Sequence, residues 1–96
     1  MSMNLEATVK KTGEEVNLWQ TPTWVTEMCL YSYKKNKKGE YKKRHWKDTR
    51  ALYLAWVKSH TQGTFYSSED IDAMKITVES HQNYIMSLGK LEWSLG

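Results

Sequence analysis

The sequence has a single cysteine, a single proline and a single phenylalanine, and its longest apolar run, Ala51–Val57, spans only seven residues. One cysteine excludes an intrachain disulfide, and because Cys29 stands between Met28 and Leu30 we expect a small buried side chain rather than a reactive thiol. A run of that length is far too short to cross a bilayer. The first residues, Met1–Glu6, lack a basic region followed by an apolar stretch. We therefore expect no membrane segment, no signal peptide and a cytoplasmic location.

Metal-binding and catalytic patterns are scarce as well. The histidines are far apart in the sequence: His45, His60 and His81. With one cysteine they do not form the closely spaced ligand set that zinc requires, and the scattered glycines leave no phosphate-binding loop. The acids Glu69 and Asp70 stand at an expected helix N-terminus, where the helix dipole accounts for them. We expect no metal, no cofactor and no catalytic residue, and therefore a protein that is not an enzyme.

Trp and Tyr, by contrast, are abundant. The chain of 96 residues has five Trp and six Tyr, and its length fits a single small globular domain over residues 1–96. A domain of this size buries only about 60–65% of its unfolded surface, so its core needs large apolar side chains. Because Trp and Tyr also carry a polar group, they suit binding surfaces too. We give the core more weight and leave both uses open.

Positive charge is concentrated in one segment. Between Lys34 and Lys47 stand eight Lys or Arg residues and one acid, Glu40, for a local charge of +7. Since the whole chain carries +3, the remainder carries −4. A charge contrast of this size exceeds what solubility requires and favours a binding role for the segment, although a Lys-rich loop is often only a solvated surface.

The first half of the chain predicts short elements. Residues 5–19 predict an N-terminal β-hairpin, since apolar residues alternate on both sides of a turn sequence. Thr21 and Pro22 predict the start of a short helix, with Thr21 as the N-cap and Pro22 in the first helical position. Residues 29–46 leave two alternatives open: a helix followed by a basic loop at 34–45, or a β-hairpin around the turn sequence 36–39.

The second half predicts longer helices. A broad apolar arc around Tyr53 predicts a helix over about 46–62, and a stripe from Ile71 to Ile85 predicts another over about 68–87, capped by a serine. The short connection favours an antiparallel helical hairpin. Alternating apolar residues at 91–95 fit a terminal strand or an extended segment. The fold class expected is α+β and mostly helical.

Two surfaces are candidates for binding. The first is the basic segment, in which we expect Tyr41 to be exposed and Trp46 to face the core. Its candidate partner-binding residues are Lys34, Lys35, Lys37, Lys38, Tyr41, Lys42, Lys43, Arg44 and Lys47. The second is a small, partly apolar patch on the last helix, which either contacts a second copy or partner or is covered by the N-terminal hairpin or the tail. Its residues are Ala73, Ile76, Ser80 and Tyr84.

In their general residue pattern, two runs of the sequence resemble small uncharacterised accessory proteins of tailed bacteriophages. They are Asn17–Val25 and Tyr53–His60. The resemblance implies a role in host takeover or counter-defence, where short proteins act by occluding a host macromolecule. It implies no site residues, because that group has no defined site motif.

Three functions follow, in order of preference. The first is a non-catalytic inhibitor or modulator whose basic segment covers the functional surface of a host macromolecule, either nucleic acid or the acidic groove of a protein that holds nucleic acid. The second is a direct nonspecific binder of nucleic acid, since seven of the eight cations are Lys, which favours phosphate contacts over base reading. The third is a structural subunit or homodimer assembled through the patch on the last helix.

Overall fold

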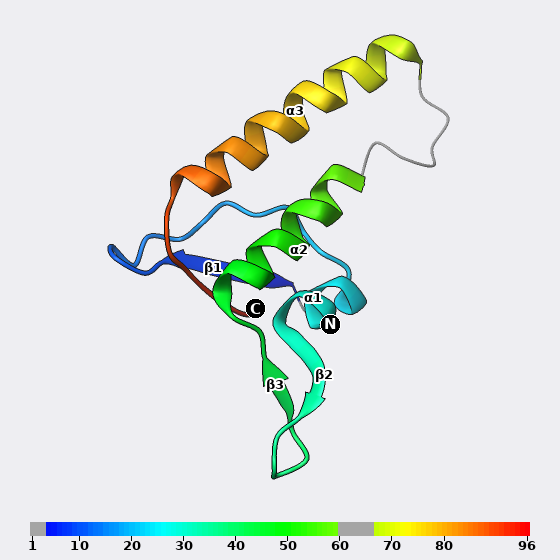
Figure 1. Cartoon of the computed structure of the whole chain (residues 1–96). Coiled ribbons are helices and arrows are strands. Elements are labelled where there is room, and N and C mark those ends of the chain that lie inside the picture. The colour runs from blue at the N-terminus through cyan, green and yellow to red at the C-terminus, as the bar shows by residue number, and fades with distance from the viewer. Residues whose placement is uncertain (1–3, 60–66) are drawn as a thin grey trace.

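The computed structural model describes residues 4–59 and 67–96, and in these ranges two antiparallel strand pairs and three helices form an α+β fold, which confirms the expected class (Figure 1). The molecule is elongated, with extents of 50 × 31 × 24 Å. In chain order the elements are β1 (Leu5–Val9), α1 (Thr23–Leu30), β2 (Tyr31–Lys35), β3 (Tyr41–Lys43), α2 (Trp46–Ser59), α3 (Ser68–Ser87) and β4 (Leu91–Leu95).

β1 and β4 join the two ends of the described chain. They pair antiparallel from Leu5 opposite Leu95 to Val9 opposite Leu91. Alternate residues of each strand are buried, as the period of two in a half-buried strand requires. Of the two alternatives for residues 91–95, the terminal strand is therefore the one that holds.

The N-terminal hairpin is corrected by this pairing. The predicted turn does form, with Gly13 at φ +73°, but the returning segment makes only one isolated bridge, between Thr8 and Glu15. After Val16 the chain turns away to other partners, because the backbone N–H of Trp19 donates to the hydroxyl of Tyr53 at 2.8 Å. β4 pairs with β1 along its whole length, whereas residues 16–19 pack Val16, Leu18 and Trp19 against the core without forming a strand.

α1 begins one residue later than predicted. Pro22 is the N-cap, and the Thr26 N–H bonds to its carbonyl oxygen. The Thr21 side chain is instead buried, where it accepts the Leu5 N–H at 3.1 Å and pairs with the Thr26 hydroxyl at 2.6 Å. Thr21 thus fastens β1 to α1 rather than capping the helix.

α2 and α3 form the predicted antiparallel helical hairpin, and α2 lies against α1 and β4 (Figure 1). α2 is described as far as Ser59, so the predicted residues 60–62 lie outside the described part. Tyr53 is its central side chain, fully buried and in ring contact with Trp56, Trp93 and His81.

α3 begins and ends as its sequence predicts. The side chain of Ser67 accepts the N–H of Asp70 at 3.2 Å, so the serine cap is confirmed. Val78 and Ile85 of the apolar stripe are buried. The helix ends before Gly89, whose φ of +74° lies in the left-handed region that only glycine adopts at little cost.

Residues 31–43 form the second strand pair, so the β-hairpin alternative for this segment holds. The predicted basic loop at 34–45 is corrected accordingly, because residues 34–35 belong to β2 and residues 41–43 to β3. Tyr residues at alternate positions favour strands, and α1 ends at Leu30, directly before them. We call residues 31–43 the basic hairpin. It projects from the body in Figure 1.

Candidate binding surface

The tip of the basic hairpin is a defined turn rather than a loose loop. The Gly39 N–H donates to the Asn36 carbonyl at 3.0 Å, and Gly39 has φ +81°. The Asn36 side-chain oxygen also accepts two N–H groups, from Lys38 at 2.9 Å and from Glu40 at 3.0 Å. A three-residue turn that ends on a left-handed glycine is a common hairpin closure. It fixes the backbone from which Lys37 and Lys38 project.

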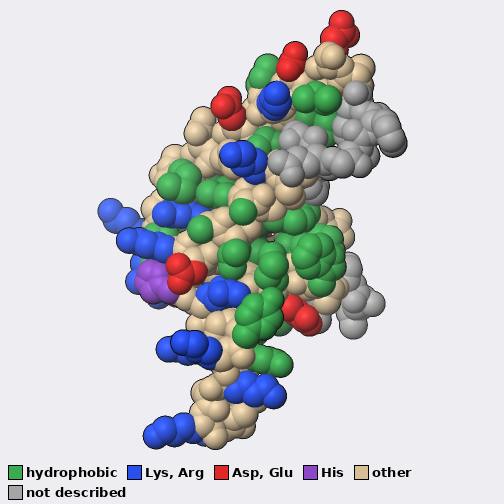
Figure 2. Space-filling model, turned by 45° about the vertical axis from the view of Figure 1, so that its right-hand side comes forward, with side chains coloured by type: hydrophobic (Ala, Val, Ile, Leu, Met, Phe, Trp, Pro, Cys, Tyr) green, Lys and Arg blue, Asp and Glu red, His purple; other side chains and the backbone are tan. Residues whose placement is uncertain are grey.

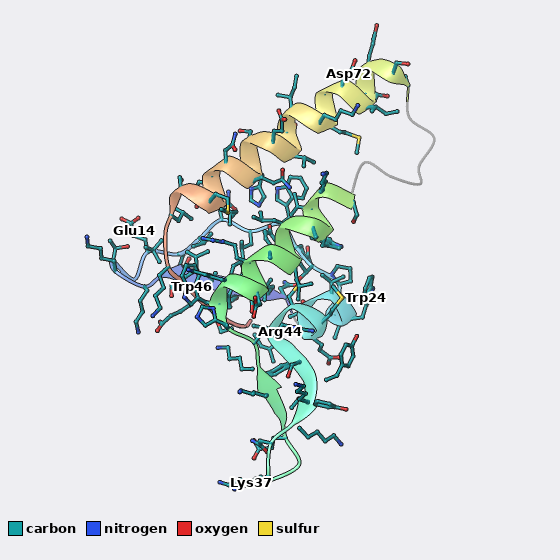
Figure 3. All side chains as sticks on the ribbon, viewed as in Figure 1. Glu14, Trp24, Lys37, Arg44, Trp46 and Asp72 are labelled. Carbon is teal, nitrogen blue, oxygen red and sulfur yellow. The ribbon has the colours of Figure 1, made fainter. Side chains whose placement is uncertain are left out.

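The basic hairpin presents its charge to solvent. Every residue from Tyr33 to Lys43 is exposed, and no salt bridge within residues 4–59 and 67–96 joins a hairpin lysine to a carboxylate. Figure 2 shows Lys and Arg side chains along this projection, whereas carboxylates gather along α3. In Figure 3 Lys37 marks the hairpin tip and Asp72 lies at the opposite end of the molecule. The charge contrast of the sequence is therefore also a contrast in space.

The structure brings seven of the nine predicted partner-binding residues together on the hairpin and its strands. They are Lys34, Lys35, Lys37, Lys38, Tyr41, Lys42 and Lys43. Lys35 lies over the Tyr41 ring, 5.2 Å from its centre. Tyr41 is 55% exposed and Trp46 is partly buried against the core, so both expectations for these rings are confirmed.

The cations at the hairpin base are partly committed to the fold. Lys43 donates through Nζ to the Trp93 carbonyl at 2.5 Å. Arg44 donates through Nε to the Met28 carbonyl at 2.9 Å and through its backbone N–H to Leu30. Lys47 belongs to the first turn of α2, where its ammonium lies 5.7 Å from the Trp46 ring. Lys43 and Arg44 thus anchor the hairpin to the body, and the lysines beyond them are exposed to solvent.

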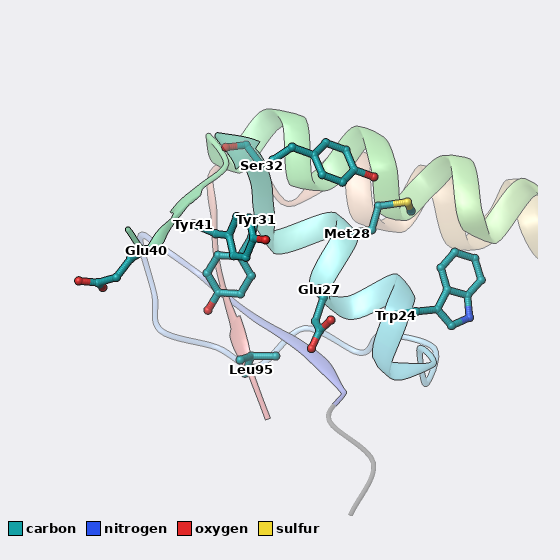
Figure 4. Close-up of a pocket in the computed structure, with 9 residues that line it drawn as sticks. Trp24, Glu27, Met28, Tyr31, Ser32, Glu40, Tyr41 and Leu95 are labelled. Carbon is teal, nitrogen blue, oxygen red and sulfur yellow. The ribbon is translucent and has the colours of Figure 1, made fainter. Parts of the chain in front are cut away.

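An aromatic groove lies between α1 and the basic hairpin. We define it by Trp24, Met28, Tyr31, Tyr33 and Tyr41, with Glu27 among them, and its volume is about 580 Å³. Trp24 is 66% exposed and Tyr33 is 87% exposed. In Figure 4 Trp24 stands at the α1 end and Tyr41 at the hairpin end, with Glu27 and Met28 on the helix between them.

The groove was missed by sequence reasoning, which predicted a short helix after Thr21 and left residues 29–46 open between a helix with a basic loop and a β-hairpin. The signal that would have found it is the alternation of Tyr31 with Tyr33, which is typical of a strand.

The patch on α3 is open at one end and partly covered at the other. Ile76 is 69% exposed, whereas Tyr84 is 37% exposed. The Tyr84 hydroxyl accepts the Asn17 N–H at 3.1 Å, so the segment after the N-terminal turn covers that end. Ala73 and Ser80 are exposed. The segment after the N-terminal turn thus covers part of the patch, as one of the two alternatives expected, and Ile76 stays exposed.

Two further chemistry-bearing side chains pack against the core: Cys29, which is buried, and His81, which is half-buried. Burial raises the pKa of Cys29 to about 11, so its thiol is neutral at neutral pH. His81 stacks on Trp19 with ring centres 4.8 Å apart, and its Nε2 pairs with the Tyr53 hydroxyl at 2.8 Å. Burial lowers the pKa of His81 and raises that of Tyr53 to about 12. His81 lies within the stripe predicted from Ile71 to Ile85 and is half-buried against Trp19 and Tyr53, while His60 lies outside the described residues.

Neither a metal cluster nor a membrane span occurs in the described ranges. No three His, Cys, Asp or Glu side chains of residues 4–59 and 67–96 are grouped so as to hold a metal ion. None of the helices in this part of the chain has the length and apolar character needed to cross a bilayer.

Comparison with known proteins adds no relative. No family model matches the chain, and neither the curated proteins nor the solved structures contain a significant match. The basic hairpin and the aromatic groove therefore have to be interpreted from their own chemistry.

Proposed function

We propose that this chain is a non-catalytic binding protein whose basic hairpin covers the anionic functional surface of a larger macromolecule. The observation that carries the proposal is the exposure of the hairpin lysines on a projecting ribbon with a defined turn. The resemblance to phage accessory proteins makes a host macromolecule in the cytoplasm the expected partner, and the protein acts on it as an inhibitor or modulator.

Physical chemistry supports a binding role over a purely solubilising one. Lysines that repel one another destabilise a ribbon, and a two-stranded pair is marginal by itself in water. Here the ribbon is nevertheless held at both ends, by the Asn36–Gly39 turn and by the contacts of Lys43 and Arg44. A solvated loop needs no such anchoring. A ribbon that presents charge to a partner needs it, because a preorganised surface loses less entropy on binding.

Affinity capture from host lysate tests the proposal. The wild-type chain is compared with the triple variant Lys37→Ser, Lys38→Ser, Lys42→Ser, which removes three exposed hairpin charges. Capture is run with and without nuclease, because the nuclease separates a nucleic-acid partner from a protein partner. We expect the triple variant to lose the partner that the wild type retains.

The control is a triple variant with the same loss of charge on the body. Lys11, Lys75 and Lys90 are exposed and lie outside the hairpin, and their replacement by Ser should leave capture unchanged. Equal loss in both variants would show that net charge, and not the hairpin, attracts the partner, and the proposal would then fail.

A further inference from the structure

We propose that the partner is an unpaired nucleic-acid strand, whose phosphates contact the hairpin lysines while one or two of its bases stack in the aromatic groove. The proposal rests on the proposed function and names the chemical class of its partner. It joins two surfaces that adjoin in the structure, since Tyr33 and Tyr41 belong to both the basic hairpin and the groove.

The exposed rings are the first reason. Trp24 at 66% and Tyr33 at 87% exposure give up apolar burial that a chain of this size needs for its stability. Flat rings that stand in solvent beside cations match a nucleotide, which carries a flat base next to a phosphate. In a duplex the bases are paired and stacked inside, so only an unpaired strand presents base faces to these rings.

The kind of cation is the second reason, and it decides between nucleic acid and an acidic protein. Protein interfaces are enriched in Arg and depleted in Lys. Seven of the eight cations between positions 34 and 47 are Lys, and the one Arg, Arg44, donates to the Met28 carbonyl in the fold. Phosphate contacts driven by counterion release are served well by Lys.

The carboxylate of Glu27 is the third reason. It lies on α1 among the groove residues, and Glu40 of the hairpin turn is the second carboxylate of the lining (Figure 4). Both repel phosphate, so the strand's phosphates are expected at the exposed hairpin lysines and not inside the groove. A carboxylate also accepts hydrogen bonds from the amino groups of bases. The groove therefore offers rings and an acceptor to bases, and the hairpin offers cations to phosphates.

Fluorescence anisotropy with a labelled single-stranded oligonucleotide of about 15 nucleotides tests the proposal, with a duplex of equal length beside it. Trp24→Leu and Tyr33→Leu keep an apolar side chain and remove the ring. Each should weaken single-strand binding by between about fivefold and about 150-fold, the range of one base–ring stack, and leave duplex binding unchanged. Tyr84→Leu, which removes a ring on α3, should bind as the wild type does.

Salt dependence adds a second reading of the same complex. Contact with about five phosphates of a single strand predicts a slope of log affinity against log salt near about −3.5. Replacing Lys37, Lys38 and Lys42 by Ser should reduce the magnitude of that slope by about 2, whereas the ring variants should leave the slope unchanged and lower the affinity at every salt concentration.

Three results would overturn the inference: no binding of the wild type to the oligonucleotide, ring variants that bind it as the wild type does, or ring variants that lose duplex and single-strand binding equally. The capture experiment separates such a failure from failure of the proposed function. If a partner survives nuclease and is lost with the hairpin lysines, the partner is a protein and the proposed function stands without this inference. If neither capture nor oligonucleotide binding depends on those lysines, both fail.

Discussion

The described residues contain two antiparallel ribbons of short strands, and they differ in register, in burial and in their place in the molecule. β1–β4 buries Leu5, Ala7, Leu91 and Trp93 on one face. β2–β3 buries none of its side chains fully, and its outer part from Tyr33 onward is exposed on both faces. The first ribbon joins distant parts of the chain and belongs to the core, whereas the second connects neighbouring segments and projects into solvent.

Antiparallel pairing alone therefore does not distinguish a strand pair that belongs to the core from one that is exposed for binding. Both have antiparallel registers, but burial supplies the stability of β1–β4, while β2–β3 depends on its turn and on a few contacts at its base. One ribbon should therefore govern folding and the other binding. Substitutions that separate these two properties test the comparison.

The largest effect is expected from matched aromatic substitutions in the two ribbons. Trp93→Ala removes a side chain that is 2% exposed and in contact with Tyr53, so it should lower the free energy of unfolding by about 3–5 kcal/mol. Tyr33→Ala removes one that is 87% exposed, so its effect should stay within about 0.5 kcal/mol. Urea denaturation measures both.

A control for the Trp93 substitution comes from its indole nitrogen, which is buried with no hydrogen-bond partner in the described structure. Trp93→Phe therefore loses no hydrogen bond and should cost clearly less than Trp93→Ala. Equal losses for Trp93→Ala and Tyr33→Ala would mean that the hairpin contributes to the core and that the two ribbons do not differ as described.

A smaller effect is expected where the ribbons touch. Lys43 donates to the Trp93 carbonyl, so Lys43→Ser removes a charge-assisted hydrogen bond and should destabilise the protein by about 1 kcal/mol. Its neighbour Lys42 is exposed and has no salt bridge to a described carboxylate, so Lys42→Ser should leave stability nearly unchanged. The midpoints of thermal unfolding of the two variants test this difference. Equal midpoints would contradict the anchoring role of Lys43.

The pH dependence of stability should come in part from the body, through His81. Burial lowers the pKa of His81 below its usual 6.5 in the folded protein, so between the two values the unfolded chain binds more protons than the folded one. Stability should therefore fall as the pH decreases through 6.5 toward the lower pKa of the folded protein. His81→Gln keeps an acceptor for the Tyr53 hydroxyl and removes the titration, so its stability should depend less on pH. An unchanged pH profile in this variant would contradict the assignment.

The smallest effect on folding is expected at Ile76. It is 69% exposed on α3, so Ile76→Glu should change the free energy of unfolding by less than about 0.5 kcal/mol. If the patch with Ala73, Ser80 and Tyr84 contacts a second copy, the same variant should convert a dimer to a monomer in light scattering at working concentration. A wild-type monomer would remove the homodimer hypothesis and leave the basic hairpin as the binding surface.

Local patterns predicted the helices well. The apolar stripe and serine cap of α3 and the arc around Tyr53 in α2 are interactions between residues a few positions apart, so the sequence shows them directly. The partner of β1 could not be predicted in this way. Leu5 pairs with Leu95 across nearly the whole chain, and no local signal favours that register over the turn beside it.

Only part of the candidate site could be predicted from the sequence. The cluster of lysines is visible as composition, and Tyr41 was expected to be exposed. The contribution of Trp24 and Tyr33 to the groove was not predicted. It depends on α1 ending at Leu30, where the chain continues directly as a strand. That boundary is set by tertiary packing, which buries Cys29 and Leu30 and leaves the rings on either side of them in solvent.

The central claim is that the basic hairpin serves binding and adds little to folding, and one paired measurement tests it most directly. The variant Lys37→Ser, Lys38→Ser, Lys42→Ser is assayed both for capture of the partner and for the free energy of unfolding. The account predicts that capture is lost while the free energy of unfolding changes by less than about 0.5 kcal/mol. Retained capture, or a loss of stability of about 2 kcal/mol or more, would contradict it.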